Sequence, residues 1–288
     1  MSECAFYMVD AFTAVPFTGN PCAVVLADDL KDADMARIAR ETNAPETAFV
    51  LPSDKADVRV RYFMPRGEIP FAGHPTIATG HLLREIGRLG MGTASFAFNI
   101  GILPVEIGAD NVTMTQPAAV PGVTADTPRT AQALGLDVSD LRAGLPCQVM
   151  RGGVSFLMVP VRRFAALERI RMDRAALKAV LTEAGVAAAY VFAPEGLDAA
   201  SDAHARLIDP DNPGEDPFTG SAAGCMASYL YACGLCPGGR IRLEQGHLRE
   251  RPGYGTLDIV TAPGEDGKVR AVRLSGTAVI TGSGTLRW

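Results

Sequence analysis

The 288-residue sequence lacks several features that mark whole classes of protein. It has no basic excess, since 27 Lys and Arg residues stand against 32 Asp and Glu residues, and the net charge is −5. A basic surface for nucleic acid is therefore not expected. The N-terminal residues lack the basic start and long apolar core of a signal peptide. With no export signal, the six cysteines are interpreted as free thiols, and the protein is predicted to be cytoplasmic.

Common cofactor and metal motifs are also missing. The sequence has no Rossmann fingerprint, Walker A loop, HExxH or GxSxG pattern. Cys233 and Cys236 form one CxxC pair without a second pair or a histidine at zinc spacing, so metal binding there is not favoured. His81 and His204 are interpreted as structural residues.

No long apolar run is free of helix-breaking residues. The longest uncharged stretch, from Pro217 to Gly239, is long enough to raise the question of a membrane span. Prolines and glycines interrupt it near both ends. We therefore expect a buried helix of a globular protein and no membrane partner.

What the sequence does contain is an internal repeat. Residues 70–83 begin Pro-Phe-Ala-Gly-His, and residues 217–230 begin Pro-Phe-Thr-Gly-Ser, at an offset of 147. Upstream, residues 35–52 and 177–194 each read as an amphipathic helix, a turn and an apolar strand ending at proline. Because both pairs occur in the same order, duplication is favoured over chance similarity.

Short strands fill the space between these elements. Five stretches have the alternation or the apolar composition of strands: residues 58–62, 154–161, 189–193, 256–261 and 268–274. The sequence thus predicts an α+β protein with two similar duplicated halves, residues 1–118 and 119–288. This division leaves open whether the last strand packs with the C-terminal half or returns to the N-terminal half.

Two helix starts are predicted where the repeat is clearest. Because proline is favoured at the first helical position, His74 before Pro75 is expected at or beside the N-cap, and Ser221 holds the same place in the second half. Gly80 and Gly224 are poor helix residues, which close packing against strands would explain. Free N–H groups at helix starts bind anions without Lys or Arg. If the two starts face one another across a cleft, they would hold an anionic small molecule; each alone is explained equally well as a plain capped helix.

The repeat is informative where its copies differ. Glu46 has Ala188 as its counterpart, and Asp216 has Ile69. A carboxylate present in one half only is not required by the fold. Glu46 lies at the start of an apolar strand, where partial desolvation would raise the pKa of its carboxyl toward the range useful for proton transfer. The alternative is a glutamate that caps a turn or pairs with an arginine.

Several short segments together carry a resemblance to a known family: Val9-Asp10-Ala11-Phe12, Gly19-Asn20-Pro21, Glu46-Thr47-Ala48-Phe49-Val50, residues 68–75, residues 215–223, Glu244-Gln245-Gly246 and Arg251-Pro252. On these segments, over essentially the whole chain, the sequence resembles the phenazine-biosynthesis isomerase (PhzF-like) family of the diaminopimelate epimerase fold. The resemblance implies two similar domains, each a curled, barrel-like mixed sheet around a central buried helix, with the active site in the cleft between them.

The resemblance also implies a site and a reaction. Glu46 would be the catalytic acid/base, with His74 and Asp216 as its polar partners. The implied substrate-binding residues are Asn20, Gly73, Gly220 and Ser221. The family's characterised activity isomerises trans-2,3-dihydro-3-hydroxyanthranilate, in which one carboxyl group removes a proton and returns it elsewhere on the same face. This chemistry implies no metal and no organic cofactor.

Three functions remain open at this point. The first is a cofactor-independent isomerase that moves a proton on a small, cyclic or other, carboxylic acid. The second is a racemase or epimerase for an amino acid or hydroxyproline-type substrate. Related enzymes of that kind use two thiols, and here those positions hold Ala72 and Thr219, while Cys225 lies further into its helix. The third is a non-catalytic protein that binds a small acid. For all three we expect a small carboxylate partner and a homodimer.

Overall fold

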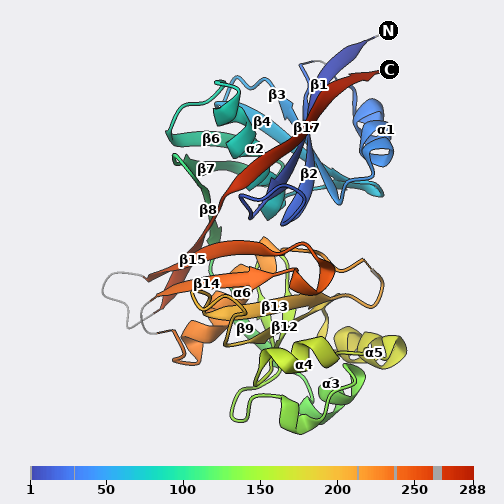
Figure 1. The fold of residues 1–288 in the computed structure, drawn as a ribbon, viewed down its shortest axis with the longest axis vertical. Coiled ribbons are helices and arrows are strands. Elements are labelled where there is room, and N and C mark those ends of the chain that lie inside the picture. The colour runs from blue at the N-terminus through green and yellow to red at the C-terminus, as the bar shows by residue number, and fades with distance from the viewer. Residues whose placement is uncertain (1, 29, 213, 237–238, 262–267) are drawn as a thin grey trace. The chain divides into compact units, whose positions relative to one another are not determined.

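The computed structural model describes residues 2–28, 30–212, 214–236, 239–261 and 268–288, so Pro237 and Gly238 of the predicted helix-breaking segment lie outside the described residues. The chain divides into two compact units (Figure 1). The first comprises Met1–Thr115 and Ser275–Trp288, and the second comprises Gln116–Leu274. The C-terminal strand belongs to the first unit because it pairs with the first strand, which brings the two termini side by side (Figure 1).

The first unit is built from strands with two helices. Its strands are β1 (Glu3–Ala11), β2 (Asn20–Leu26), β3 (Glu46–Leu51), β4 (Val58–Met64), β5 (Gly67–Ile69), β6 (Gly92–Phe98), β7 (Gly101–Ile107), β8 (Val112–Pro117, whose last two residues enter the second unit) and β17 (Ala278–Arg287). Its helices are α1 (Asp32–Thr42) and α2 (Gly73–Glu85).

The second unit has a similar content with more helices. Its strands are β9 (Val120–Thr124), β10 (Gln148–Arg151), β11 (Phe156–Pro160), β12 (Ala189–Ala193), β13 (Ala203–Ile208), β14 (Arg240–Gln245), β15 (Gly253–Thr261) and β16 (Val269–Gly276, which ends in the first unit). Its helices are α3 (Thr127–Ala133), α4 (Phe164–Arg169), α5 (Arg174–Ala184) and α6 (Gly220–Ala232), with single 3-10 turns η1 (Val138–Asp140) and η2 (His247–Arg249).

The internal repeat reappears in the pairing of the strands. In the first unit β2 and β3 are parallel, β3 and β4 antiparallel, β4 and β6 parallel, and β6 and β7 antiparallel. In the second unit the same series runs through β11, β12, β13, β14 and β15. In chain order, the long buried helix of each unit lies between two strands that pair in parallel. Helix α2 lies between β4 and β6, and helix α6 lies between β13 and β14.

The predicted strands agree with this description. Residues 58–62 lie in β4 and residues 189–193 form β12. The apolar run 154–161 contains β11, and the two alternating stretches near the end of the chain lie in β15 and β16. The chain is a mixed α/β protein with a large mixed sheet. Among the described residues, the helices are too short or too polar to cross a membrane.

Helices α2 and α6 are buried, as predicted, and their glycines allow it. Helix α2 packs against β1, β2, β3, β7 and β17, and α6 packs against β9, β10, β11 and β15. A Cβ atom on Gly80 would lie 2.9 Å from the Val112 side chain, and one on Gly224 would lie 2.6 Å from the Gln116 side chain. Gly80 therefore permits the close approach of Val112 on β8, as predicted, whereas Gly224 makes room for the end of the Gln116 side chain, whose Nε2 donates to the Gly220 carbonyl.

The helix starts differ from the prediction. Helix α2 begins at Gly73 with Ala72 as its N-cap, and α6 begins at Gly220 with Thr219 as its N-cap. His74 and Ser221, expected at or beside the N-cap, are second helical residues, and Pro75, expected at the first position, is the third. The physical reason is that the first four N–H groups of a helix have no intrahelical acceptor, so proline is tolerated throughout that turn and does not mark its first residue.

Candidate active site

Glu46 occupies the end of a strand that is otherwise apolar. Helix α1 ends at Asn43, which has a left-handed backbone conformation with φ 49°, and the chain enters β3 at Glu46. Further along β3, Phe49 is fully buried against α1 and forms an edge-to-face contact with Phe63. The buried strand fixes the backbone of Glu46, while its side chain keeps 18% of its surface exposed. A carboxylate in this position is held firmly and remains reachable from solvent.

Three predicted site residues meet at this strand end. His74 Nδ1 lies 2.9 Å from Glu46 Oε2, and Asn20 Nδ2 lies 3.1 Å from the same Nδ1 atom. Asn20 is the first residue of β2 and is fully buried, and His74 is 5% exposed. Strands β2 and β3 and helix α2 thus bring together residues that are distant in the sequence.

Glu46 Oε2 and His74 Nδ1 lie close enough for a proton to pass between them. If Nδ1 carries the proton, it donates to the Glu46 carboxylate, and the Asn20 amide presents its oxygen to the ring. If Nδ1 is bare, its one lone pair accepts either from the Asn20 amide or from a protonated Glu46. Whenever Glu46 and His74 bond to each other, one proton is shared by a carboxyl group and an imidazole, which is a pair suited to taking up and returning a proton.

Residues 216–219, directly before helix α6, form a bend that we call the second corner. It is held by a residue whose role the sequence did not indicate. Gln245, at the end of β14, is fully buried. Its Oε1 atom accepts hydrogen bonds from the Thr219 backbone N–H (3.2 Å) and the Tyr190 hydroxyl (2.9 Å), and its Nε2 donates to the Asp216 carbonyl (2.8 Å). The Thr219 hydroxyl in turn donates to Asp216 Oδ2 at 2.6 Å. Gln245 therefore fixes the backbone around Asp216, although it entered the sequence analysis only as part of a family motif.

The predicted substrate-binding residues of the helix starts lie in the first turn. Gly73 and Gly220 are the first residues of α2 and α6, and Ser221 follows Gly220. Ser221 is half-buried, and no acidic residue lies in either first turn. Each helix start thus presents backbone N–H groups and the positive end of a helix dipole, which favour an anion.

Glutamates that the two halves share have a structural role. Arg61 on β4 forms two hydrogen bonds to Glu68, at 2.8 and 2.7 Å. In the second unit Arg206 on β13 forms two to Glu215, at 2.9 and 2.8 Å. The same pair occurs at the same place in both units, so it belongs to the fold. Glu46 and Asp216, which have apolar counterparts, do not follow this pattern.

Thiols are poorly placed for proton transfer. Cys225 lies inside α6 with its Sγ 3.6 Å from the Val154 carbonyl, and burial raises its pKa to about 12. Cys22 is paired with Glu46 in the parallel register of β2 and β3. Burial, and to a smaller extent the Glu46 charge, raise the pKa of the Cys22 thiol well above its ordinary value. Neither thiol supplies a thiolate near neutral pH.

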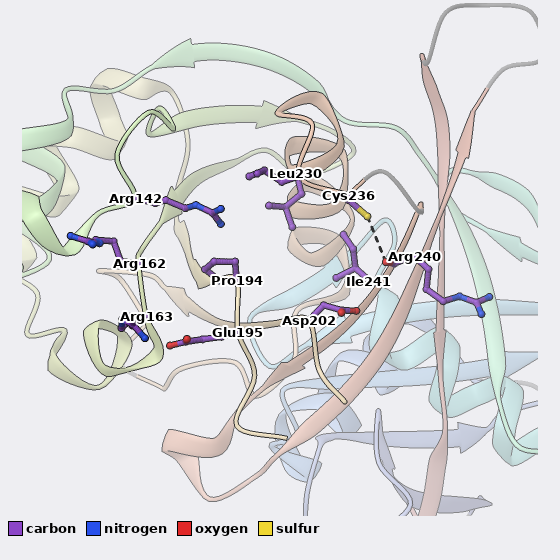
Figure 2. Close-up of a pocket in the computed structure, with 11 residues that line it drawn as sticks. Arg142, Arg162, Arg163, Pro194, Glu195, Asp202, Leu230, Cys236, Arg240 and Ile241 are labelled. Carbon is purple, nitrogen blue, oxygen red and sulfur yellow. Dashed lines mark hydrogen bonds between the residues drawn. The ribbon is translucent and has the colours of Figure 1, made fainter. Parts of the chain in front are cut away.

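A cavity of about 650 Å³ in the second unit is separate from these residues (Figure 2). Its lining includes Arg142, Arg162 and Arg163, together with Glu195 and Asp202. In Figure 2 the Arg142 side chain points toward Leu230 and Pro194. None of the predicted site residues belongs to the lining given by the described part of the chain. The cavity therefore adds nothing to the proton-transfer chemistry of Glu46 and His74.

Comparison with known proteins gives a consistent result over the whole chain. A family model described as phenazine biosynthesis-like protein (PhzC-PhzF) matches residues 9–284. The uncharacterized isomerase YddE of Escherichia coli K12 is 35% identical over 285 residues, covering 95% of each chain. Trans-2,3-dihydro-3-hydroxyanthranilate isomerase of Pseudomonas chlororaphis is 33% identical over 295 residues, covering 98% of each chain.

Solved structures agree. The crystal structure of a PhzF-family phenazine biosynthesis protein from Bacillus anthracis matches with a TM-score of 0.91 and 30% identity, covering 100% of both chains. A hydroxyproline epimerase from Agrobacterium vitis matches with a TM-score of 0.63 and 15% identity, covering 99% of this chain and 92% of its own. At that identity the second match is evidence for a shared fold alone.

Proposed function

This chain belongs to the phenazine biosynthesis-like (PhzF) family of isomerases, and from that premise we propose that it moves a proton on a small carboxylic acid by carboxylate acid/base catalysis. The observation that carries the proposal is the 2.9 Å contact between Glu46 Oε2 and His74 Nδ1 at the end of β3. This carboxylate has no counterpart in the second unit, so the fold does not require it.

In the proposed reaction Glu46 removes a proton from carbon and returns it to another carbon on the same face of the substrate. His74 supports both states of Glu46, because its ring donates to the carboxylate and accepts from the carboxylic acid. Asn20 keeps the imidazole in place through its contact with Nδ1.

The substrate carboxylate would be bound by helix-start N–H groups. Gly73, at the start of α2, is the proposed donor in the unit that holds Glu46 and His74, and Gly220 and Ser221, at the start of α6, offer donors of the same kind in the second unit. Each hydrogen bond to a charged group contributes roughly 1.5–3 kcal/mol, so two or three bind a small acid without a guanidinium. Asp216 would accept a hydrogen bond from a hydroxyl or amino group of the substrate. A cyclic acid similar to trans-2,3-dihydro-3-hydroxyanthranilate, the substrate named for the Pseudomonas chlororaphis relative, is the first compound to test.

A deuterium-exchange screen tests the proposal even when the product has not been identified. The protein is incubated in D₂O with a panel of cyclic and amino-acid carboxylates, and incorporation of deuterium at carbon is followed by NMR. We expect exchange with at least one cyclic acid, and Glu46→Gln should slow it by about 10²–10⁴-fold. Glu183→Gln, which changes an exposed glutamate on α5 paired with Arg129, is the matched control and should exchange at the wild-type rate. If Glu46→Gln incorporates deuterium at the wild-type rate, Glu46 is not the base.

The racemase alternative finds support in the fold alone. The positions that would carry two thiols are Ala72 and Thr219, the N-cap residues of α2 and α6. Since two-thiol chemistry needs both thiols, we expect no racemisation of proline or hydroxyproline by polarimetry. If the wild-type protein abolishes the optical rotation of a proline or hydroxyproline solution at a catalytic rate, the racemase alternative is favoured.

A further inference from the structure

A histidine–carboxylate–histidine cluster lies in the second unit, formed by His204, Glu244 and His247. His204 on β13 and Glu244 on β14 face one another in the parallel register of the two strands, and both are fully buried. His247 is the first residue of η2 and is partly exposed. One potential ligand atom from each of the three residues lies within 4.8 Å of the others.

The geometry of the cluster brings three potential metal ligands together. His204 Nδ1 lies 2.9 Å from Glu244 Oε1, and His247 Nε2 lies 4.0 Å from Glu244 Oε2. The two imidazole rings have centroids 4.9 Å apart and are tilted by 51°. The Tyr254 hydroxyl lies 3.3 Å from His247 Nε2. Two imidazoles and a carboxylate are a donor set that proteins use for zinc and related ions.

Two buried nitrogen atoms in this cluster have unused bonding capacity. His204 Nε2 and His247 Nδ1 are both inaccessible to solvent and have no hydrogen-bond partner among the residues that the structure describes. These are not the nitrogens that lie beside Glu244, which are His204 Nδ1 and His247 Nε2, so the case for a ligand rests on the approach of those two atoms and the carboxylate.

We propose that His204, Glu244 and His247 bind a divalent transition-metal ion of the zinc type. One negative carboxylate and two neutral imidazoles attract a dication, and the partly exposed His247 gives the ion a route to the buried pair. The fourth position is available to water or to the hydroxyl of Tyr254. The ion would have a structural role, outside the proton transfer proposed for Glu46.

The surroundings of Glu244 hold the carboxylate in place. The backbone N–H groups of Leu197 and Asp198 both donate to it, the second at 3.3 Å. Asp198 is held in turn by Arg242 at 3.1 Å. Groups that bond to a ligating carboxylate in this way fix its orientation for the metal. The alternative is that these hydrogen bonds alone stabilise the cluster and that it binds no metal ion.

A metal ion here would stabilise the corner that carries Asp216. Gln245 follows Glu244 directly and forms the hydrogen bonds that fix Asp216 and Thr219. Gly246 comes next with φ 90°, and a Cβ atom there would lie 2.7 Å from the Pro217 carbonyl. Because β14 connects the cluster to this corner within three residues, metal loading should raise the thermal stability of the folded protein.

The test uses the full-length, untagged protein after treatment with EDTA and gel filtration. Zinc sulfate is titrated by calorimetry, and bound zinc is counted by mass spectrometry after dialysis. We expect one zinc ion per chain and a higher Tm with zinc. His247→Ala should lose both effects, while His81→Ala, a half-buried histidine of α2 outside the cluster, should retain them.

Variants of the cluster and of the thiols show whether zinc binds at the cluster, at the CxxC thiols or at neither. His247 lies in a three-residue turn, so replacing it should leave the β13–β14 pair folded, which far-UV circular dichroism checks. Cobalt substitution in wild type should give visible absorption bands that are absent in His247→Ala. Wild type that binds no more zinc than His247→Ala would overturn the proposal. So would zinc binding that Cys233→Ser abolishes and His247→Ala preserves, because the ion would then lie on the CxxC thiols.

Discussion

Gln245 offers the sharpest test of how the second corner is built. Replacing it with methionine keeps most of the side-chain volume and removes its polar atoms. Three groups then lose their partner: the Thr219 N–H, the Tyr190 hydroxyl and the Asp216 carbonyl. Each buried group left unpaired costs about 1–3 kcal/mol. We therefore expect Gln245→Met to lower the free energy of unfolding by about 3 kcal/mol or more.

A second glutamine provides the control for this magnitude. Gln148 on β10 is half-buried and donates one hydrogen bond, from Nε2 to the Gly122 carbonyl at 3.2 Å. Gln148→Met should therefore cost only about 1 kcal/mol. Both values are measured by urea unfolding at neutral pH, followed by circular dichroism, with proton exchange at carbon as a second readout. If Gln245→Met unfolds at the same urea concentration as Gln148→Met, the hydrogen-bond network does not hold the corner, and the reasoning fails.

Three further predictions concern packing, thiols and pH. Gly80→Ala should destabilise the protein by about 1–3 kcal/mol in urea unfolding despite the better helix propensity of alanine, because its Cβ atom would lie 2.9 Å from Val112; a stabilised variant would contradict the close packing. Iodoacetamide at pH 8 should leave Cys225 unmodified in peptide mass spectra, since a pKa of about 12 keeps the buried thiol protonated; early labelling would refute this. The hydrogen bond from Arg61 lowers the pKa of Glu68, so the pair stabilises the fold above the unfolded-state pKa and loses this effect as the pH falls below it. The difference in unfolding free energy between wild type and Arg61→Met should therefore be constant above about pH 5 and shrink in more acidic buffer; a difference that grows in acid would reverse the sign of this argument.

Local patterns in the sequence were sufficient for much of the fold. The alternation of residues 58–62 and the apolar run 189–193 predicted β4 and β12, and the repeat predicted two similar halves. The strand senses, which match between the two units, were not predicted. These features depend on side-chain periodicity, which a sequence shows directly. The helix starts were misplaced because proline is compatible with any position of the first turn, so Pro75 does not mark its first residue.

Contacts between distant residues were beyond the reach of pattern alone. Gln245 is 26 residues from Thr219 and 55 from Tyr190, and nothing in its local sequence indicates that it bonds to both. His204 was interpreted as structural, and Glu244 was noted only within a motif. Their contact depends on the parallel pairing of β13 with β14, whose register no local pattern specifies. Residues that act through long-range pairing become visible only when the strands are placed.

The comparison between the two units gives the strongest physical argument for where the chemistry lies. Arg61 with Glu68, and Arg206 with Glu215, form the same ion pair in both units, so those carboxylates are explained by folding. Glu46 lacks that explanation, because the strand that begins beside Ala188 forms the same parallel pair without a carboxylate. A partly exposed glutamate next to a buried histidine is costly to maintain, since both groups lose hydration. The fold does not require the Glu46 carboxyl group, and this group lies within hydrogen-bond distance of the His74 imidazole. The proton that the two groups can share is the best explanation for their position.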